Sequence, residues 1–92
     1  MNYTEEQLTI ISNNLLTVNI KAKEVLKVIK DTSEISNKDI SEVTKLSKFV
    51  IDKCIAAFIA CGLVTFIADG TTKYYRITLE GQKILNINRE GK

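Results

Sequence analysis

The hydrophobic residues in the first third of the chain recur every three or four positions, which predicts two amphipathic helices. The first is expected over residues 4–18 with Thr4 as its N-cap, and its apolar face consists of Leu8, Ile11 and Leu15. The second is expected to run from Asn19, as the N-cap, to about Lys30. Its apolar face consists of Ala22, Val25, Leu26 and Ile29.

A short apolar segment and a third helix follow. Ile35 is expected as the first small strand of a sheet, and Ser36 with Asp39 has the spacing of a capping box. The helix after Ser36 is expected over about residues 37–44. Ile40 and Val43 are expected to face inward from this helix.

A tight turn at Lys45-Leu46 then leads into a fourth helix. This helix is expected from its N-cap, Ser47, to about Cys61, and Gly62 fits the left-handed residue that ends many helices. The inward positions of this helix are Ile51, Cys54, Ile55, Phe58 and Cys61.

The pattern then changes to that of a β-hairpin. Residues 63–68 and 73–78 are rich in β-branched and aromatic side chains, and Asp69-Gly70 between them is a strong hairpin signal. Tyr74 and Tyr75 alternate across the second strand, so one of them is expected to face the core. Thr78 is expected to cap a last helix that reaches about Asn88, with Leu79, Ile84 and Leu85 as its apolar set.

Length and composition restrict the class of protein. The 92 residues suffice for one domain, residues 1–92, with a net charge of +2 that favours nucleic acid only mildly. No apolar run approaches the roughly 20 residues of a membrane span, and the polar N-terminus resembles no targeting signal, so a cytoplasmic protein is expected. The chain has no His and only two Cys, and it has no phosphate-binding or nucleophile motif. We therefore expect no enzyme, no metal site and no cofactor.

The whole series resembles the winged helix-turn-helix family, in particular small MarR-like and archaeal-type regulators. The stretch from Ser36 to Ser47 is similar to the first helix and turn, and Leu46-Ser47-Lys48 begins the recognition-helix pattern. Residues 69–78 resemble the wing, and Thr78-Leu79-Glu80-Gly81 begins the ending "T-x-x-G-x-x-(I/L)-L" that many such domains share. The resemblance implies a mainly α fold with a small β-hairpin (α+β) and an extra N-terminal helix. The helix-turn-helix is expected at about 36–61, the wing at 63–78 and the last helix at 78–88.

The resemblance also implies a function and a set of contact residues. Family members of this kind bind double-stranded DNA as transcription regulators, with the recognition helix in the major groove and the wing on the backbone or in the minor groove. Phe49 is an apolar member of the set; it is interpreted either as a contact to a thymine methyl or sugar, or as a cover for the wing or core. Carried over by position, the contact residues are Lys38, Lys45, Ser47, Lys48, Phe49, Asp52, Lys53, Thr72, Lys73 and Arg76.

The sequence departs from the family pattern at the recognition helix. Positions that usually carry charge hold Ala56, Ala57, Ile59 and Ala60, and residues 32–78 carry six basic and five acidic side chains, a net charge of +1. Binding by one copy is therefore expected to be weak and sensitive to salt. Lys45 stands at the turn where the family usually has Gly, and a left-handed Lys costs roughly 1 kcal/mol.

Two further hypotheses follow from this departure. The near-neutral helix is also typical of a winged helix that binds a protein partner in place of DNA, and a ligand- or redox-responsive DNA-binding sensor is a third interpretation. Cys54 and Cys61 are two helical turns apart, roughly 10 Å, so they are interpreted as small core residues rather than a disulfide.

A homodimer is expected because a small domain with weak DNA contacts gains from a second copy. The first helix, together with the last helix around Ile84 and Ile87, is the hypothetical interface. The alternative is that the first helix folds back onto its own domain.

Overall fold

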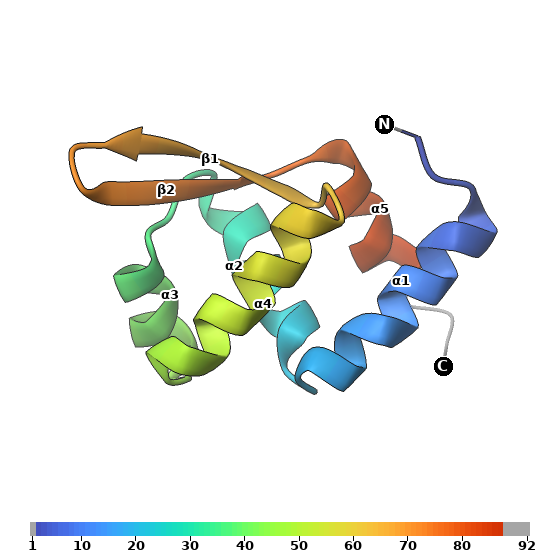
Figure 1. Ribbon diagram of the computed structural model, residues 1–92, viewed down its shortest axis with the longest axis horizontal. Helices are drawn as coiled ribbons and strands as arrows, with labels where there is room; N and C mark the ends of the chain where they lie inside the picture. The colour runs from blue at the N-terminus through green and yellow to red at the C-terminus, as the bar shows by residue number, and fades with distance from the viewer. Residues whose placement is uncertain (1, 88–92) are drawn as a thin grey trace.

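The computed structural model describes residues 2–87 of the chain. Within that range five helices and a two-stranded antiparallel sheet follow one another in the order that the sequence predicts (Figure 1). Their bounds are α1 Glu5–Val18, α2 Ala22–Thr32, α3 Asn37–Thr44, α4 Lys48–Ala60, β1 Val64–Asp69, β2 Thr72–Ile77 and α5 Leu79–Ile87. The predicted end of the last helix at Asn88 lies outside the described residues.

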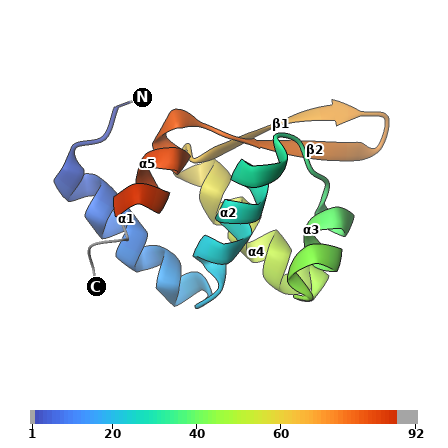
Figure 2. The ribbon, with the colours of Figure 1, turned by 180° about the vertical axis from the view of Figure 1, so that it is seen from behind.

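The elements are arranged along an elongated molecule of 38 × 26 × 20 Å. Figures 1 and 2 show α1 and α5 at one end and α3 with the tip of the β-hairpin at the other, and α2 and α4 lie between them. The start of α4 lies at the same end as α3. The two ends of the molecule therefore present different surfaces.

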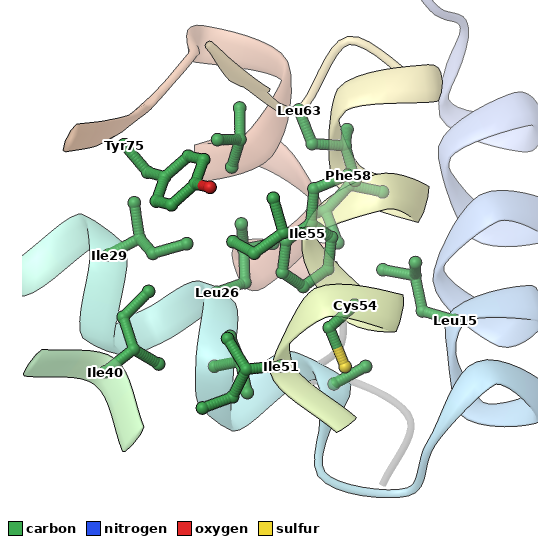
Figure 3. Packing of buried hydrophobic residues seen from close by; sticks show 14 of the residues in the cluster. Leu15, Leu26, Ile29, Ile40, Ile51, Cys54, Ile55, Phe58, Leu63 and Tyr75 are labelled. Atoms are coloured by element: carbon green, nitrogen blue, oxygen red, sulfur yellow. The ribbon is translucent and has the colours of Figure 1, made fainter. Parts of the chain in front are cut away.

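The core forms where α2 and α4 meet beneath the hairpin (Figure 3). Leu26 and Ile29 of α2 and Ile51 and Phe58 of α4 have no exposed surface. The predicted apolar faces of these two helices are therefore confirmed, with Cys61 only half-buried at the end of its face. Burial of one such large side chain contributes about 1.5–3 kcal/mol to folding.

Side chains at the helix starts supply the hydrogen bonds that the first helical turns need. The Thr4 hydroxyl accepts from the amide of Gln7, whose side chain accepts in return from the amide of Thr4. Ser36 and Ser47 accept from backbone amides of α3 and α4 in the same way. The Thr78 hydroxyl accepts from the amide of Gly81 at the start of α5. Four of the five predicted N-caps are therefore confirmed.

The prediction for α2 is wrong at both ends. Asn19 lies before the helix, where its Oδ1 accepts from the amide of Lys21, and the helix begins at Ala22. At the other end the helix continues to Thr32, because the Thr32 hydroxyl donates to the carbonyl of Val28. Asn19 therefore caps a turn that precedes the helix, a local conformation that Asn favours as strongly as a helix cap.

Two residues predicted to be inward are exposed. Val43 on α3 exposes 60% of its surface and Leu79 on α5 exposes 71%. Helix α3 has eight residues and lies at one end of the molecule. It buries Ile40 in the core, and Val43 on the following turn faces solvent. Leu79 is the first residue of α5 and faces outward, whereas Glu80 and Gly81, which follow it, are buried.

Helix α1 folds back onto its own domain. Leu8 and Leu15 are buried in the common core, as is Ile84 of α5. The Tyr3 hydroxyl also donates a 2.6 Å hydrogen bond to the carbonyl of Cys61, which ties the segment before α1 to the end of α4. The apolar face of α1 is thus packed within its own chain, as the alternative hypothesis expects, and its buried residues are not available to a second copy.

Each strand of the hairpin lies one residue nearer the turn than predicted. Its register pairs Val64 with Ile77 and Asp69 with Thr72, so the loop is Gly70-Thr71. Gly70 takes a φ of +66°, and a glycine at the first loop position is typical of a tight hairpin turn that matches the strand twist.

The base of the hairpin joins the rest of the fold through one further pairing. Ile35 forms the predicted small bridge, with Tyr75 of β2. Tyr75 faces the core and Tyr74 is partly exposed, which confirms the expected alternation. Lys45 has the left-handed conformation predicted for the turn, with a φ of +64°.

Candidate nucleic-acid interface

An open groove of about 520 Å³ lies between α3, the start of α4 and the hairpin. Three lysines from three separate elements line it: Lys38 of α3, Lys48 of α4 and Lys73 of β2. Hydroxyl groups complete much of the lining, from Ser36, Thr71 and Thr72. Asp39 also lines the groove, so residues far apart in the sequence form one surface on which three lysines and several hydroxyl groups outnumber a single acidic side chain.

Two helix N-termini flank this groove. Ser36 caps α3 and lines the groove, and Ser47 caps α4 immediately before Lys48. The first amides of a helix carry a partial positive charge and can bind an anion such as a phosphate. The groove therefore combines lysine charge with the positive ends of two helices.

Phe49 is the second residue of α4 and is highly exposed, with 71% of its surface accessible. The Lys53 Nζ lies 5.4 Å from the centroid of its ring, one helical turn further along. This exposure excludes the interpretation of Phe49 as a core or wing cover. The start of α4 therefore presents an aromatic ring between two lysines, Lys48 and Lys53.

The Asp52 side chain on α4 interacts with a residue of the neighbouring helix α3. Its carboxylate accepts a hydrogen bond from the side-chain amide of Asn37 at the start of α3. Burial raises the pKa of the Tyr75 hydroxyl, and the negative charge of Asp52 raises it further, which indicates that Asp52 lies near β2. Asp52 thus links α4 to α3 beside the groove.

Arg76 on β2 is already paired within the chain. Its guanidinium binds the carboxylate of Glu34 through both Nε and a terminal nitrogen. The positive charge that was expected for a DNA contact is therefore balanced by a neighbouring carboxylate. Lys73 remains in the groove, with its Nζ 4.9 Å from the ring centroid of Phe66.

All ten predicted contact residues are exposed, but the structure does not gather them all. Four line the groove: Lys38, Lys48, Thr72 and Lys73. Phe49 and Lys53 lie beside it on α4, whereas Lys45 lies at the far end of α3 as its C-cap. Sequence reasoning missed Asn37 and Glu34, whose roles depend on partners 15 and 42 residues away.

Neither cysteine takes part in this surface. Burial raises the pKa of the Cys54 thiol, against a smaller opposite effect of Lys53, and both cysteines are free thiols. Across residues 2–87, no three side chains of the metal-binding types come together. No helix in the same range is long and apolar enough to cross a membrane.

A tri-helical core with a sharp turn between α3 and α4, followed by a hairpin that packs on it, is the winged helix-turn-helix fold. The chain has the fold of MarR-like winged-helix regulators, as comparison with solved structures shows. It is similar over its whole length to TubR bound to 24 bp of tubC, from Bacillus thuringiensis serovar israelensis pBtoxis. The TM-score is 0.76 with 16% identity, and 99% of that chain is covered.

Two further structures have the same fold. An ArsR-like transcriptional regulator from Rhodococcus sp. RHA1 matches 94% of this chain and 81% of its own, with 23% identity and a TM-score of 0.69. The oxidised form of MarR from E. coli matches 89% of this chain and 60% of its own, with 15% identity and a TM-score of 0.66. None of these three proteins is described as an enzyme. No family model matches the sequence, and no curated protein matches it either.

Proposed function

We propose that the protein is a transcription regulator that binds double-stranded DNA. In this proposal the start of α4 enters the major groove and the hairpin contacts the backbone or the minor groove. The observation that carries it is the groove in which Lys38, Lys48 and Lys73 meet beside two helix N-termini. Lysines and helix-end amides are the groups that bind DNA phosphates. The shared fold with TubR bound to 24 bp of tubC supports the same conclusion.

The proposal is tested by fluorescence anisotropy with a mixed AT-rich duplex pool at several salt concentrations. A Lys38→Ala/Lys48→Ala/Lys73→Ala variant removes the three groove charges. If each lysine binds one phosphate, the slope of log K against log salt falls in magnitude by about 2.7 per bound copy. Absence of binding by the unmodified protein at low salt would refute the proposal.

The chain offers a matched control for this experiment. A Lys21→Ala/Lys27→Ala/Lys30→Ala variant removes the same charge from exposed positions on and just before α2. These lysines lie near Glu24 and Asp31 instead of in the groove. The control is expected to keep nearly the whole salt slope. An equal loss in both variants would indicate attraction by net charge alone.

The protein is further proposed to bind DNA as a homodimer. Helix α1 exposes 54% of Ile10 and 46% of Leu16, and Ile20 follows with 79% exposed. Figure 1 shows α1 at the end of the molecule opposite α3 and the tip of the hairpin, so two copies could join through α1 and leave both grooves free. Sedimentation of an Ile10→Asp/Leu16→Asp variant, with Val43→Asp as control, tests it. The proposal requires that only the first variant sediments as a monomer.

A protein-interaction module is the second candidate function. It is favoured by the later turns of α4, where Ile59 is 38% exposed beside the exposed Ala56 and Ala60. Such a surface has no charge with which to bind phosphate. If the anisotropy experiment detects no binding of DNA, this face of α4 is the place at which to test a protein partner.

A further inference from the structure

The hydrogen-bonding side chains at the start of α4 are largely engaged within the protein. The Ser47 hydroxyl accepts from the amide of Val50 at 3.2 Å, and the Asp52 carboxylate accepts from Asn37. Helix α4 also contains no Asn or Gln, the residues that form paired hydrogen bonds to adenine, and its Lys48 and Lys53 are suited to guanine or phosphate. The helix is therefore poorly equipped to recognise A·T base pairs by hydrogen bonding.

Phe49 is the large side chain that remains free at this position. Most of its surface is exposed, although an exposed phenyl ring gains nothing from contact with water. The ammonium group of Lys53 lies 5.4 Å from the centroid of its ring, within the range of a cation–π interaction. The ring thus faces outward at the second residue of the helix, next to a positive charge.

The charges around Phe49 indicate which kind of molecule it contacts. Lys48 precedes it and Lys53 follows it, and Lys48 also lines the groove with Lys38 and Lys73. A positive surface with an exposed apolar ring beside it complements a polyanion that carries an apolar group. In the major groove of DNA that group is the C5-methyl of thymine.

We propose that Phe49 packs against thymine C5-methyl groups and thereby gives the protein a preference for A·T base pairs. This inference rests on the proposed function, because it requires α4 to lie in the major groove. It assigns base recognition to an apolar contact, whereas the groove lysines bind phosphates without regard to sequence.

The test compares two forms of the same AT-rich duplex pool, one with thymine and one with deoxyuridine in its place. The substitution removes the methyl group and leaves the hydrogen-bonding edges of the base unchanged. Burial of one methyl group predicts that the unmodified protein binds the thymine pool about four-fold more tightly for each contacted methyl. Phe49→Ala is expected to bind both pools equally and to keep the salt dependence of binding.

Leu79→Ala is the matched control, because Leu79 is also 71% exposed but lies at the start of α5. It is expected to keep the preference for thymine. Circular dichroism melting checks that Phe49→Ala is folded, which its exposure leads us to expect.

The outcomes separate the two proposals. If the unmodified protein binds both pools equally, or if Phe49→Ala keeps the thymine preference, the role of Phe49 is refuted and DNA binding stands. If the unmodified protein binds neither pool, DNA binding itself is refuted and the role of Phe49 falls with it.

Discussion

The Nε of Arg76 donates a 2.8 Å hydrogen bond to Oε2 of Glu34, which joins β2 to the segment between α2 and α3. Ser33, the residue before Glu34, has a φ of +69°. This strained turn directs the chain toward the hairpin. The ion pair is about half-exposed, so it adds at most about 1 kcal/mol to stability. Its larger effect is to neutralise a cation of the hairpin.

Glu34→Gln is therefore expected to strengthen DNA binding. Without the carboxylate, Arg76 becomes available for one phosphate, which increases the slope of log K against log salt by about 0.9 per bound copy. Anisotropy over a range of salt concentrations measures this slope. Glu42→Gln removes the same charge from exposed α3, where Glu42 lies apart from Arg76, and serves as the control. Equal slopes in the two variants would contradict a specific release of Arg76.

Gly81→Ala is expected to destabilise the protein, although alanine normally favours a helix by about 1 kcal/mol over glycine. A Cβ at Gly81 would lie 2.4 Å from the carbonyl oxygen of Leu63 and 2.6 Å from Ile77 Cγ1. That carbonyl also accepts from the amide of Thr78, so it cannot move away freely. Urea denaturation measures the loss.

Gly70→Ala separates this steric effect from a backbone effect. A Cβ at Gly70 meets no atom within 4 Å, but the positive φ there still costs about 1 kcal/mol. We expect Gly81→Ala to be the more damaging of the two. Stabilisation by Gly81→Ala would show that α5 packs less closely against the hairpin than described.

Phe58→Ala is expected to reduce the free energy of unfolding by about 3–5 kcal/mol, because its fully buried ring leaves a cavity between α2 and α4. Phe66→Ala removes an equal ring that is 39% exposed on the hairpin, and its cost is expected to be much smaller. Denaturant titration of both variants measures the difference. Similar losses would argue against the core described for α4.

Stability is expected to fall in alkaline solution because of Cys54. Burial holds the pKa of its thiol above the ordinary 9.0, so the unfolded chain releases this proton first. The stabilising effect is present below pH 9 and is lost as the pH rises above it, at up to about 1.4 kcal/mol per pH unit. Urea midpoints from pH 7 to 10 measure this loss. Cys54→Ala should flatten the curve and Cys61→Ala should not; a flat curve for the unmodified protein would contradict burial of the thiol.

Local sequence signals predicted the fold well because they act over a few residues. The N-caps Thr4, Ser36, Ser47 and Thr78 each accept from the amide of the residue three positions later. The apolar spacing of α2 and α4 similarly depends on helical geometry alone. Asn19 was misassigned because the same side chain can cap a helix or a preceding turn, and the choice depends on packing.

Features that depend on distant partners could not be predicted. The sequence suggested that Arg76 and Asp52 contact DNA, but their pairing with Glu34 and Asn37 appears only when the hairpin and the two helices are folded together. Gly81 was recognised as part of a motif. The physical reason for a glycine at this position is the close approach of the Leu63 carbonyl, 18 residues earlier in the chain. Lys38, Lys48 and Lys73 likewise line one groove only in the folded protein.

In the proposed complex, DNA binds across the groove and the start of α4. The most direct test is an NMR titration of the ¹⁵N-labelled protein with the AT-rich duplex pool. Amide shifts are expected to concentrate at residues 36–39, 47–53 and 71–74, whereas the buried amides of α2 are expected to change little. Shifts confined to other surfaces, or no shifts at low salt, would contradict the proposed complex.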